Sequence, residues 1–327
     1  MNPTAAKIYA VHGQDLASGR VSIRELSRRL GTSFANCRAA AKKAEKTPPP
    51  GTWRVAVAGD LHFCSLHPEN SLKVARQFGQ FIDAQGRAAI KAGEKFTAVS
   101  IGDAADFASL SSWDRGKKSF EGREIRRDYD TVNACIKAIS DEISPEVWAY
   151  MARAPFVTTG NHEDRLTRWQ ADNRETSEVF GIGYPEHDDR PVNLEWRANG
   201  WDVIKFLEPE FIDEVAFMHY LPSPKSGKAI ASVNQARALL MAAHQSVVVG
   251  HSHEWRTGRL VRLDGSKIVA TVVGCSFIDD HAYAGYMGNH NYDRGFTILR
   301  GLNGSEYTPQ FLPFDQVEQY LKSRGYK

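Results

Sequence analysis

The stretch Arg54-Val-Ala-Val-Ala-Gly-Asp-Leu-His62 shows the pattern that decides the fold of this chain. A short apolar run that is closed by glycine predicts a buried β-strand, and the glycine permits a sharp turn at its end. The side chains of Asp60 and His62 should therefore lie just beyond the end of a strand.

The same arrangement recurs four times farther along the chain. Apolar runs precede GDAAD at 102–106, GNHED at 160–164, His219, and GHSH at 250–253. We expect the ends of all five strands to converge on one edge of the fold. The polar side chains expected at that edge are Asp60, His62, Asp103, Asn161, His219, His251 and His253.

These side chains offer carboxylate, amide and imidazole donors to a metal ion. Mixed oxygen and nitrogen donors suit borderline divalent metals such as Mn, Fe or Zn. Asp60 and His62 are two residues apart, as are His251 and His253, so in extended backbone each pair would point to one side. One metal could use both members of a pair, or two metals could divide them.

Each motif also has an ordinary structural interpretation. A Gly-Asp after a strand is a common turn, GNHED can cap a helix, and a lone histidine such as His219 is more often a core or surface residue. Here the five motifs occur in one order, each after a predicted strand. That conjunction favours a metal site over independent coincidences.

Through these motifs the chain resembles the calcineurin-like metallophosphoesterases over about residues 53 to 300. The family pattern is D-x-H, GD-x-x-D, GNH-[E/D], H and GH-x-H, and every part has a counterpart here. The resemblance implies two divalent ions, with manganese favoured over iron or zinc and Asp103 as the bridging ligand. It assigns one ion to Asp60, His62, Asp103 and His253, and the other to Asp103, Asn161, His219 and His251.

The resemblance also implies roles for His162 and Asp106, which are not ligands in the family. His162 would face the substrate, and Asp106 would orient it. A hydroxide held between two cations about 3.5–4 Å apart can attack a phosphoryl group in line. Imidazole titrates near neutrality, so His162 is the natural proton donor to the leaving oxygen. Phe107 and Ala108 stand where protein Ser/Thr phosphatases of the superfamily have Arg-Gly, which counts against a phosphoprotein substrate.

The pattern between the motifs predicts an α/β fold. Helices at about 71–92, 128–153 and 232–243 would join consecutive strands. The last third instead predicts hairpins, with 258–265 turning into 267–273, followed by strands at 296–299 and 307–314. Two mixed β-sheets packed face to face and covered by helices would follow, and the resemblance implies a four-layer αββα sandwich.

A small basic module precedes this domain. Residues 1–50 carry nine Lys and Arg against three Asp and Glu, a local charge of +6 in a chain of net charge +2. We predict a helical, helix-turn-helix-like domain over 1–46, a Pro-rich linker over 47–52 and the metallophosphoesterase domain over 53–327. The second helix would present its basic side chains, Arg38, Lys42 and Lys43, to DNA. A protein-docking or purely structural hairpin is the alternative.

Two functions therefore remain open. The preferred hypothesis is a dinuclear metal-dependent phosphodiesterase that acts as a DNA nuclease. The alternative is a small-molecule phosphatase or nucleotide phosphodiesterase whose N-terminal hairpin docks a protein. A catalytically silent DNA-binding regulator is disfavoured because His162 and Asp106 are both kept.

Composition adds expectations about the surroundings of the protein. No apolar run reaches the roughly 18 residues of a membrane span, and four scattered cysteines without C-x-x-C favour a reduced cytoplasmic compartment. A homo-oligomer is left open. The basic segment 107–127 could be a flap over a phosphate backbone or an ordinary surface connection, and 281–294 could form another rim of the cleft.

Overall fold

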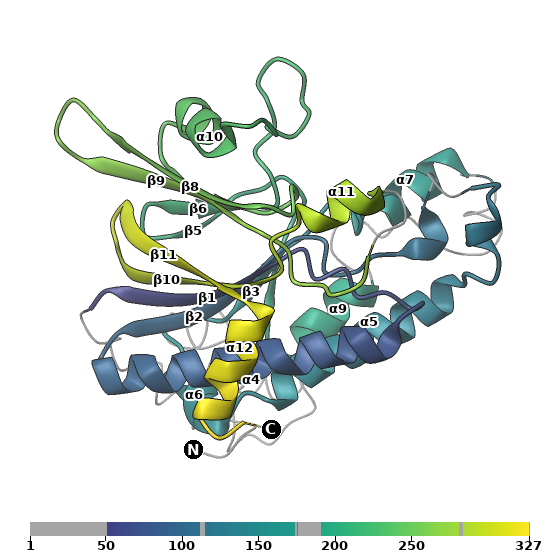
Figure 1. Cartoon of the computed structure of the whole chain (residues 1–327), viewed down its shortest axis with the longest axis horizontal. Coiled ribbons are helices and arrows are strands. Elements are labelled where there is room, and N and C mark those ends of the chain that lie inside the picture. The colour runs from purple at the N-terminus through teal and green to yellow at the C-terminus, as the bar shows by residue number, and fades with distance from the viewer. Residues whose placement is uncertain (1–50, 112–114, 174, 176–190, 281–283, 327) are drawn as a thin grey trace, which may run out of the picture.

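The protein is an α/β structure with two mixed β-sheets, as the sequence predicts (Figure 1). This computed structural model describes residues 51–111, 115–173, 175, 191–280 and 284–326. Residues 1–50 lie outside the described residues, and so does the predicted helix-turn-helix with Arg38, Lys42 and Lys43. The first strand of the described residues begins at Trp53.

The first sheet has six strands in the order β11-β10-β1-β2-β3-β4. Strands β1 to β4 are parallel, and β10 and β11 extend the sheet antiparallel beside β1. In the register, Val57 of β1 lies between Val99 of β2 and Thr297 of β10. The bounds are β1 Trp53–Gly59, β2 Lys95–Ile101, β3 Phe156–Thr158, β4 Asp202–Ile204, β10 Gly295–Asn303 and β11 Glu306–Pro313.

The second sheet has five strands in the order β5-β6-β7-β9-β8. Strands β6, β7 and β9 are parallel, whereas β5 and β8 pair antiparallel at the two edges. The predicted hairpin over 258–273 is thus confirmed as β8 and β9. The bounds are β5 Glu210–Ile212, β6 Val215–Phe217, β7 Ser246–Val249, β8 Trp255–Val261 and β9 Lys267–Val273.

Strand β1 shows how the layers are built, because its successive side chains point to opposite faces. Val55 and Val57 belong to a buried cluster that also contains Phe217 of the second sheet, so this face packs between the sheets. Ala56 and Ala58 belong to the cluster formed with the covering helices. A strand buried on both faces is apolar throughout, which is why the run before Gly59 was recognisable.

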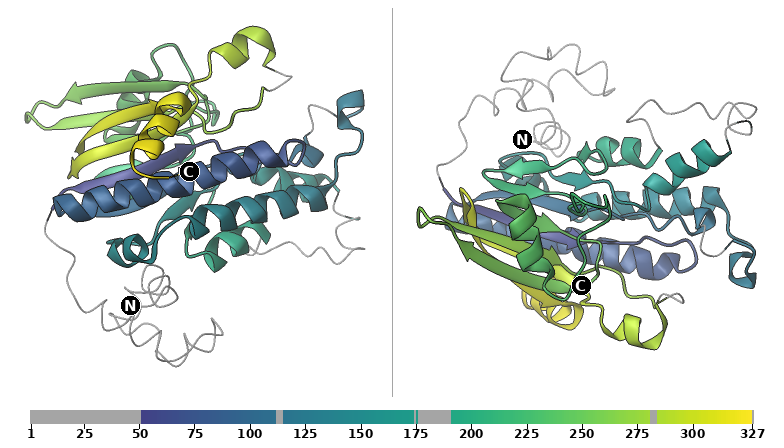
Figure 2. Two further views of the ribbon diagram at one scale, coloured as in Figure 1. Left: turned by 60° about the horizontal axis from the view of Figure 1, so that its bottom comes forward. Right: turned by 90° about the horizontal axis from the view of Figure 1, so that it is seen from above.

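Helices cover the outer face of each sheet (Figure 2). The second sheet is covered by α10, Gln235–Ala243, close to the predicted 232–243. On the outside of the first sheet, the predicted helix at 71–92 is confirmed and starts slightly earlier. The helices there are α4 Pro68–Ala92, α5 Ile125–Asp141, α6 Pro145–Tyr150, α9 Pro191–Ala198 and α12 Phe314–Ser323.

The single helix predicted over 128–153 is wrong. Helix α5 ends at Asp141, and α6 begins at Pro145 with Ser144 as its N-cap. A residue before proline is pushed out of the helical region, and Ser144 is indeed extended, with φ −63° and ψ 150°. Its side chain accepts a hydrogen bond from the backbone N–H of Val147.

The segment after GDAAD begins as part of the packed fold. Phe107 and Ala108 are buried, and the 3-10 turn η1, Ala108–Leu110, precedes η2, Lys118–Phe120. Its first residues therefore form an anchored connection. The cations that follow are exposed, except for Arg123, which is partly buried and donates a hydrogen bond of 2.9 Å to the Ala108 carbonyl oxygen. Within the described residues, no helix has both the length and the apolar composition to cross a bilayer.

Candidate metal centre

The seven predicted ligands come together at one edge of the two sheets. Five of the strands, β1, β2, β3, β6 and β7, end there, and each is followed by one of the motifs. Among the described residues, His and Asp side chains of this edge form three groups, and within each group the potential ligand atoms lie within 4.8 Å of one another. The groups are Asp60 with His62 and His253, Asp103 with His219 and His251, and His62 with Asp106 and His162.

The first group lies between the loops after β1 and β7. The Nε2 atoms of His62 and His253 are 3.3 Å apart, and His253 Nε2 lies 3.7 Å from Asp60 Oδ1. Asp60 is fully buried, and its Oδ1 has no hydrogen-bond partner among the described residues. A buried carboxylate oxygen in that state is costly unless it is compensated, so the donor set fits a cation.

The second group joins the two sheets. His219 Nε2 lies 3.4 Å from Asp103 Oδ2, 3.0 Å from Asn161 Oδ1 and 3.3 Å from His251 Nδ1. Asn161 is thus the fourth member, supplied by the loop after β3. Two imidazole nitrogens and two side-chain oxygens face one small space, which a divalent ion can fill.

Asp103, a member of the second group, also approaches the first group. Its Oδ2 is 3.9 Å from His62 Nε2 on one side and 3.4 Å from His219 Nε2 on the other. Its Oδ1 accepts a hydrogen bond of 2.8 Å from the backbone N–H of His162. One carboxylate therefore reaches both groups, which is the position that a bridging ligand needs.

The electrostatics of the buried groups also favour a cation. Burial lowers the pKa of His219, but Asp103 and Asp60 outweigh it and raise that pKa to about 9. Burial and the neighbouring His219 lower the pKa of His251 to about 4. Burial raises the pKa of Asp60 well above its ordinary value. Without a metal, the carboxylates thus attract a proton to His219, in the space where a divalent ion would replace it.

The backbone at the ligands differs from the extended chain expected for the two-residue spacing. Five ligand residues adopt left-handed φ values between 40° and 73°: Asp60, His62, Asp103, His251 and His253. Such values are uncommon for residues with a side chain. Between Asp60 and His62, Leu61 is 1% exposed and packs in the core. The kinked backbone thus sends two polar side chains to the centre and the intervening one into the apolar core.

Three motif glycines allow ligands from other strands to approach closely. A Cβ at Gly102 would lie 2.1 Å from His219 Nδ1, and one at Gly160 would lie 2.1 Å from Asp103 Oδ1. At Gly250 it would lie 2.4 Å from Asp60 Oδ2. Of the three, Gly102 alone has a positive φ, of 59°. The glycines were predicted as turn residues, but mainly they leave room for carboxylates and an imidazole.

His162 and Asp106 form the hydrogen bond that was expected. His162 Nδ1 lies 3.0 Å from both Asp106 Oδ1 and the Asp106 carbonyl oxygen. Because a carbonyl only accepts, Nδ1 carries the hydrogen. Burial acts to raise the pKa of Asp106, but hydrogen bonds from His162 and His62 hold that pKa well below its ordinary value. His162 Nε2 faces the cluster, 3.9 Å from Asp103 Oδ2.

Two further residues in or next to the GNHED motif, Glu163 and Arg165, were missed from the sequence. The buried carboxylate of Glu163 accepts backbone hydrogen bonds from Ala105 N and Gly160 N, at 2.8 and 2.7 Å, and so ties the loops after β2 and β3 together. Arg165 lies at the start of α7, Asp164–Asp172, and contacts His162. Its spacing of three residues from His162 on a helical turn was the available signal.

Aromatic rings border the first group. The Phe277 ring lies 5.1 Å from the His62 ring and 5.2 Å from the His253 ring, and Tyr292 lies 4.7 Å from His253. Tyr292 follows the short helix α11, Gly285–His290, so the end of the predicted rim segment 281–294 does lie at the centre.

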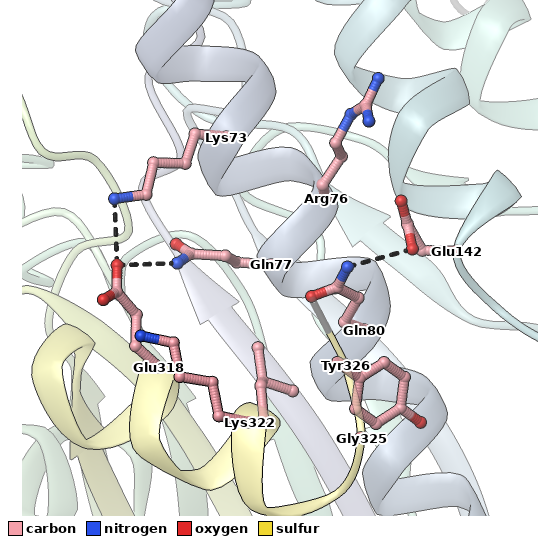
Figure 3. A pocket seen from close by; sticks show the side chains of 10 residues that line it. Lys73, Arg76, Gln77, Gln80, Glu142, Glu318, Lys322, Gly325 and Tyr326 are labelled. Carbon is pink, nitrogen blue, oxygen red and sulfur yellow. Dashed lines mark hydrogen bonds and ion pairs between the residues drawn. The ribbon is translucent and has the colours of Figure 1, made fainter.

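A separate groove lies between α4 and α12, on the helical side of the first sheet (Figure 3). Its volume is about 730 Å³, and none of its described lining residues is a predicted ligand. Its polar groups pair with one another: Lys73 with Glu318 at 3.0 Å, and Gln80 with Glu142 at 3.2 Å. Arg76 is exposed at its margin.

No protein-family model matches the chain, and no curated protein matches it.

Proposed function

We propose that this protein is a metal-dependent phosphodiesterase of the calcineurin-like kind and that its substrate is DNA. The position of Asp103, whose Oδ2 faces both ligand groups, carries the proposal. Two side-by-side ligand groups that share a carboxylate are typical of dinuclear phosphoesterase sites. The αββα arrangement of the family also agrees with helices on the outer faces of two mixed sheets.

In this proposal the two ligand groups hold two divalent ions, and manganese suits their mixed oxygen and nitrogen donors. Such a pair of ions would activate water and neutralise charge on the phosphoryl oxygens. The residues of each site are those that the family resemblance assigns: Asp60, His62, Asp103 and His253 for one ion, and Asp103, Asn161, His219 and His251 for the other.

His162 acts at the leaving oxygen. Asp106 fixes the Nδ1 hydrogen of the imidazole, so that Nε2 is the atom directed at the reacting phosphate. In the present arrangement Nε2 accepts a hydrogen bond from Arg165, because a guanidinium only donates. Proton donation from Nε2 therefore requires a protonated imidazole from which Arg165 has moved away.

DNA is proposed as the substrate because of the charge of the N-terminal segment. Residues 1–50 carry a local charge of +6, and the remaining residues then sum to −4. A basic module attached to a phosphodiesterase would hold a polyanion near the catalytic edge.

The test is hydrolysis by the manganese-loaded protein of single-stranded, duplex and nicked DNA, compared with an aryl phosphodiester and an aryl phosphomonoester. We expect cleavage of DNA and of the aryl diester. Cleavage of the small esters alone would identify a small-molecule phosphoesterase, and no cleavage of any of them would refute the proposal.

A further inference from the structure

Arg165 reaches from α7 to His162 and Asp106. Its Nη2 lies 2.8 Å from His162 Nε2, and its Nη1 donates a hydrogen bond of 2.7 Å to the Asp106 carbonyl oxygen. The guanidinium thus contacts the nitrogen of His162 that faces the two ligand groups. It is held there by the same residue that orients His162.

The guanidinium has further N–H groups with which to bind a ligand. Arginine has five N–H groups, and the bonds to His162 and Asp106 use two of them within the described part of the chain. Its contact with the Asp106 carboxylate is long, at 3.8 Å between Nη1 and Oδ1. The side chain is 21% exposed, so a ligand can reach it.

We propose that Arg165 is a catalytic residue that binds a non-bridging oxygen of the phosphoryl group held at the metal centre. This inference rests on the proposed function. A phosphoryl group that lies between the ligand groups and His162 Nε2 is next to the guanidinium without any rearrangement of α7. Guanidinium groups match the geometry of phosphate oxygens and remain charged at all working pH values.

The proposed contact distinguishes Arg165 from His162. Charge on the non-bridging oxygens must be stabilised whatever alcohol leaves, whereas a proton donor matters most for a poor leaving group. Loss of Arg165 should therefore lower activity by the same factor for good and poor leaving groups. Loss of His162 should lower activity more for poor leaving groups than for good ones.

The experiment uses the full-length, manganese-loaded protein and a series of aryl phosphodiesters with different leaving groups. Arg165→Gln should lower kcat/KM by roughly 10²–10³-fold, the range for a lost donor to developing charge. Arg165→Lys keeps the charge but not the planar fork, so it should recover part of the loss. Added guanidinium ion should partly restore Arg165→Ala, which a purely structural role would not allow.

The matched control is Arg76→Gln, the same change at an exposed helical arginine beside the groove between α4 and α12. It should leave kcat/KM unchanged. Metal content and thermal stability are measured for every variant. If Arg165→Gln lost metal or unfolded, the activity of Arg165→Lys and the rescue of Arg165→Ala by guanidinium ion would test the role of Arg165 instead. Failure of both to restore activity would overturn the inference.

Different results would refute the proposed function and the role of Arg165. An inactive wild-type protein refutes the proposed function and the inference with it. An active wild type with an equally active, metal-loaded Arg165→Gln variant refutes only the role of Arg165. A loss that shrinks for good leaving groups would also overturn it, since Arg165 would then act on the leaving oxygen.

Discussion

His219 Nε2 lies 3.4 Å from Asp103 Oδ2, although His219 follows β6 of the second sheet and Asp103 follows β2 of the first. The candidate metal centre is therefore a junction between the two sheets. Its ligands can meet only when the apolar faces of both sheets are packed together. An ion bound there would stabilise the same packing that creates its site.

The substitution Gly160→Ala tests whether the Asp103 carboxylate must approach the backbone of residue 160 closely. In Gly160→Ala the new Cβ would lie 2.1 Å from Asp103 Oδ1, so the carboxylate must move. We expect weaker metal binding and a loss of activity of at least about 10²-fold, since a misplacement of about 1 Å can have that effect. The control is Gly93→Ala, at a left-handed helix end with open space around the new Cβ. It should cost about 1 kcal/mol of stability and leave metal binding intact. Normal metal binding by Gly160→Ala would contradict the crowding described here.

His162→Ala separates proton donation from metal binding. His162 is not a proposed ligand, so the variant should keep both ions while kcat falls by roughly 10²–10⁴-fold. The loss should shrink for substrates with good leaving groups, which need less protonation. The measurement is kcat across the aryl phosphodiester series, with metal content measured in parallel. A uniform loss, or a loss of metal, would assign His162 another role.

Asp83 holds together three parts of the helical layer, and its loss should affect stability rather than activity. Its carboxylate accepts hydrogen bonds from Ser144, from Arg87 Nε at 2.8 Å and from Tyr326 OH at 2.6 Å. Asp83→Asn should lower the free energy of unfolding by about 1.5–3 kcal/mol, as for hydrogen bonds to a charged group. Asp130→Asn, at an exposed position of α5, is the control.

The effect of Asp83 should depend on pH. Burial acts to raise its pKa, but the bonds from Ser144, Tyr326 and Arg87 outweigh this and hold it below the ordinary value of 3.8. A depressed pKa contributes stability above pH 3.8, and that contribution is lost as the pH falls through the folded-state pKa. The difference between wild type and Asp83→Asn should therefore shrink in acid. A difference that stayed constant down to pH 2 would contradict this explanation.

The N-terminal segment should control DNA affinity and not the chemistry. Changing Arg38, Lys42 and Lys43 to Ala, or deleting residues 1–50, should weaken DNA binding. Each lost phosphate contact should reduce the salt dependence of the affinity by about one unit. Hydrolysis of an aryl phosphodiester should hardly change, because β1 begins at Trp53. Unchanged DNA affinity after the deletion would favour the small-molecule alternative.

The sequence predicted the features that local patterns determine. Strands β1, β2 and β7 are buried on both faces, so their apolar runs were visible, and the polar motifs marked where they end. The candidate ligands followed from residue type and position. The break between α5 and α6 was also visible in Pro145 but was overlooked.

Features that depend on contacts between distant segments were not predictable in the same way. The sequence shows a glycine at 160, but not that Asp103 lies against it. The sequence shows Arg165, but its hydrogen bond to His162 Nε2 depends on the direction of α7 relative to the GNHED motif. The left-handed backbone of Asp60 and His62 is likewise imposed by the junction, since local preference opposes it.

The most direct test of the central claim is the number of divalent ions that each chain binds, measured by metal analysis of the wild type and of Asp103→Asn. Because Asp103 Oδ2 faces both ligand groups, the wild type should bind about two ions. Asp103→Asn should bind fewer and lose more activity than any other single ligand change. One ion or none in the wild type, with near-normal turnover in Asp103→Asn, would contradict the dinuclear centre.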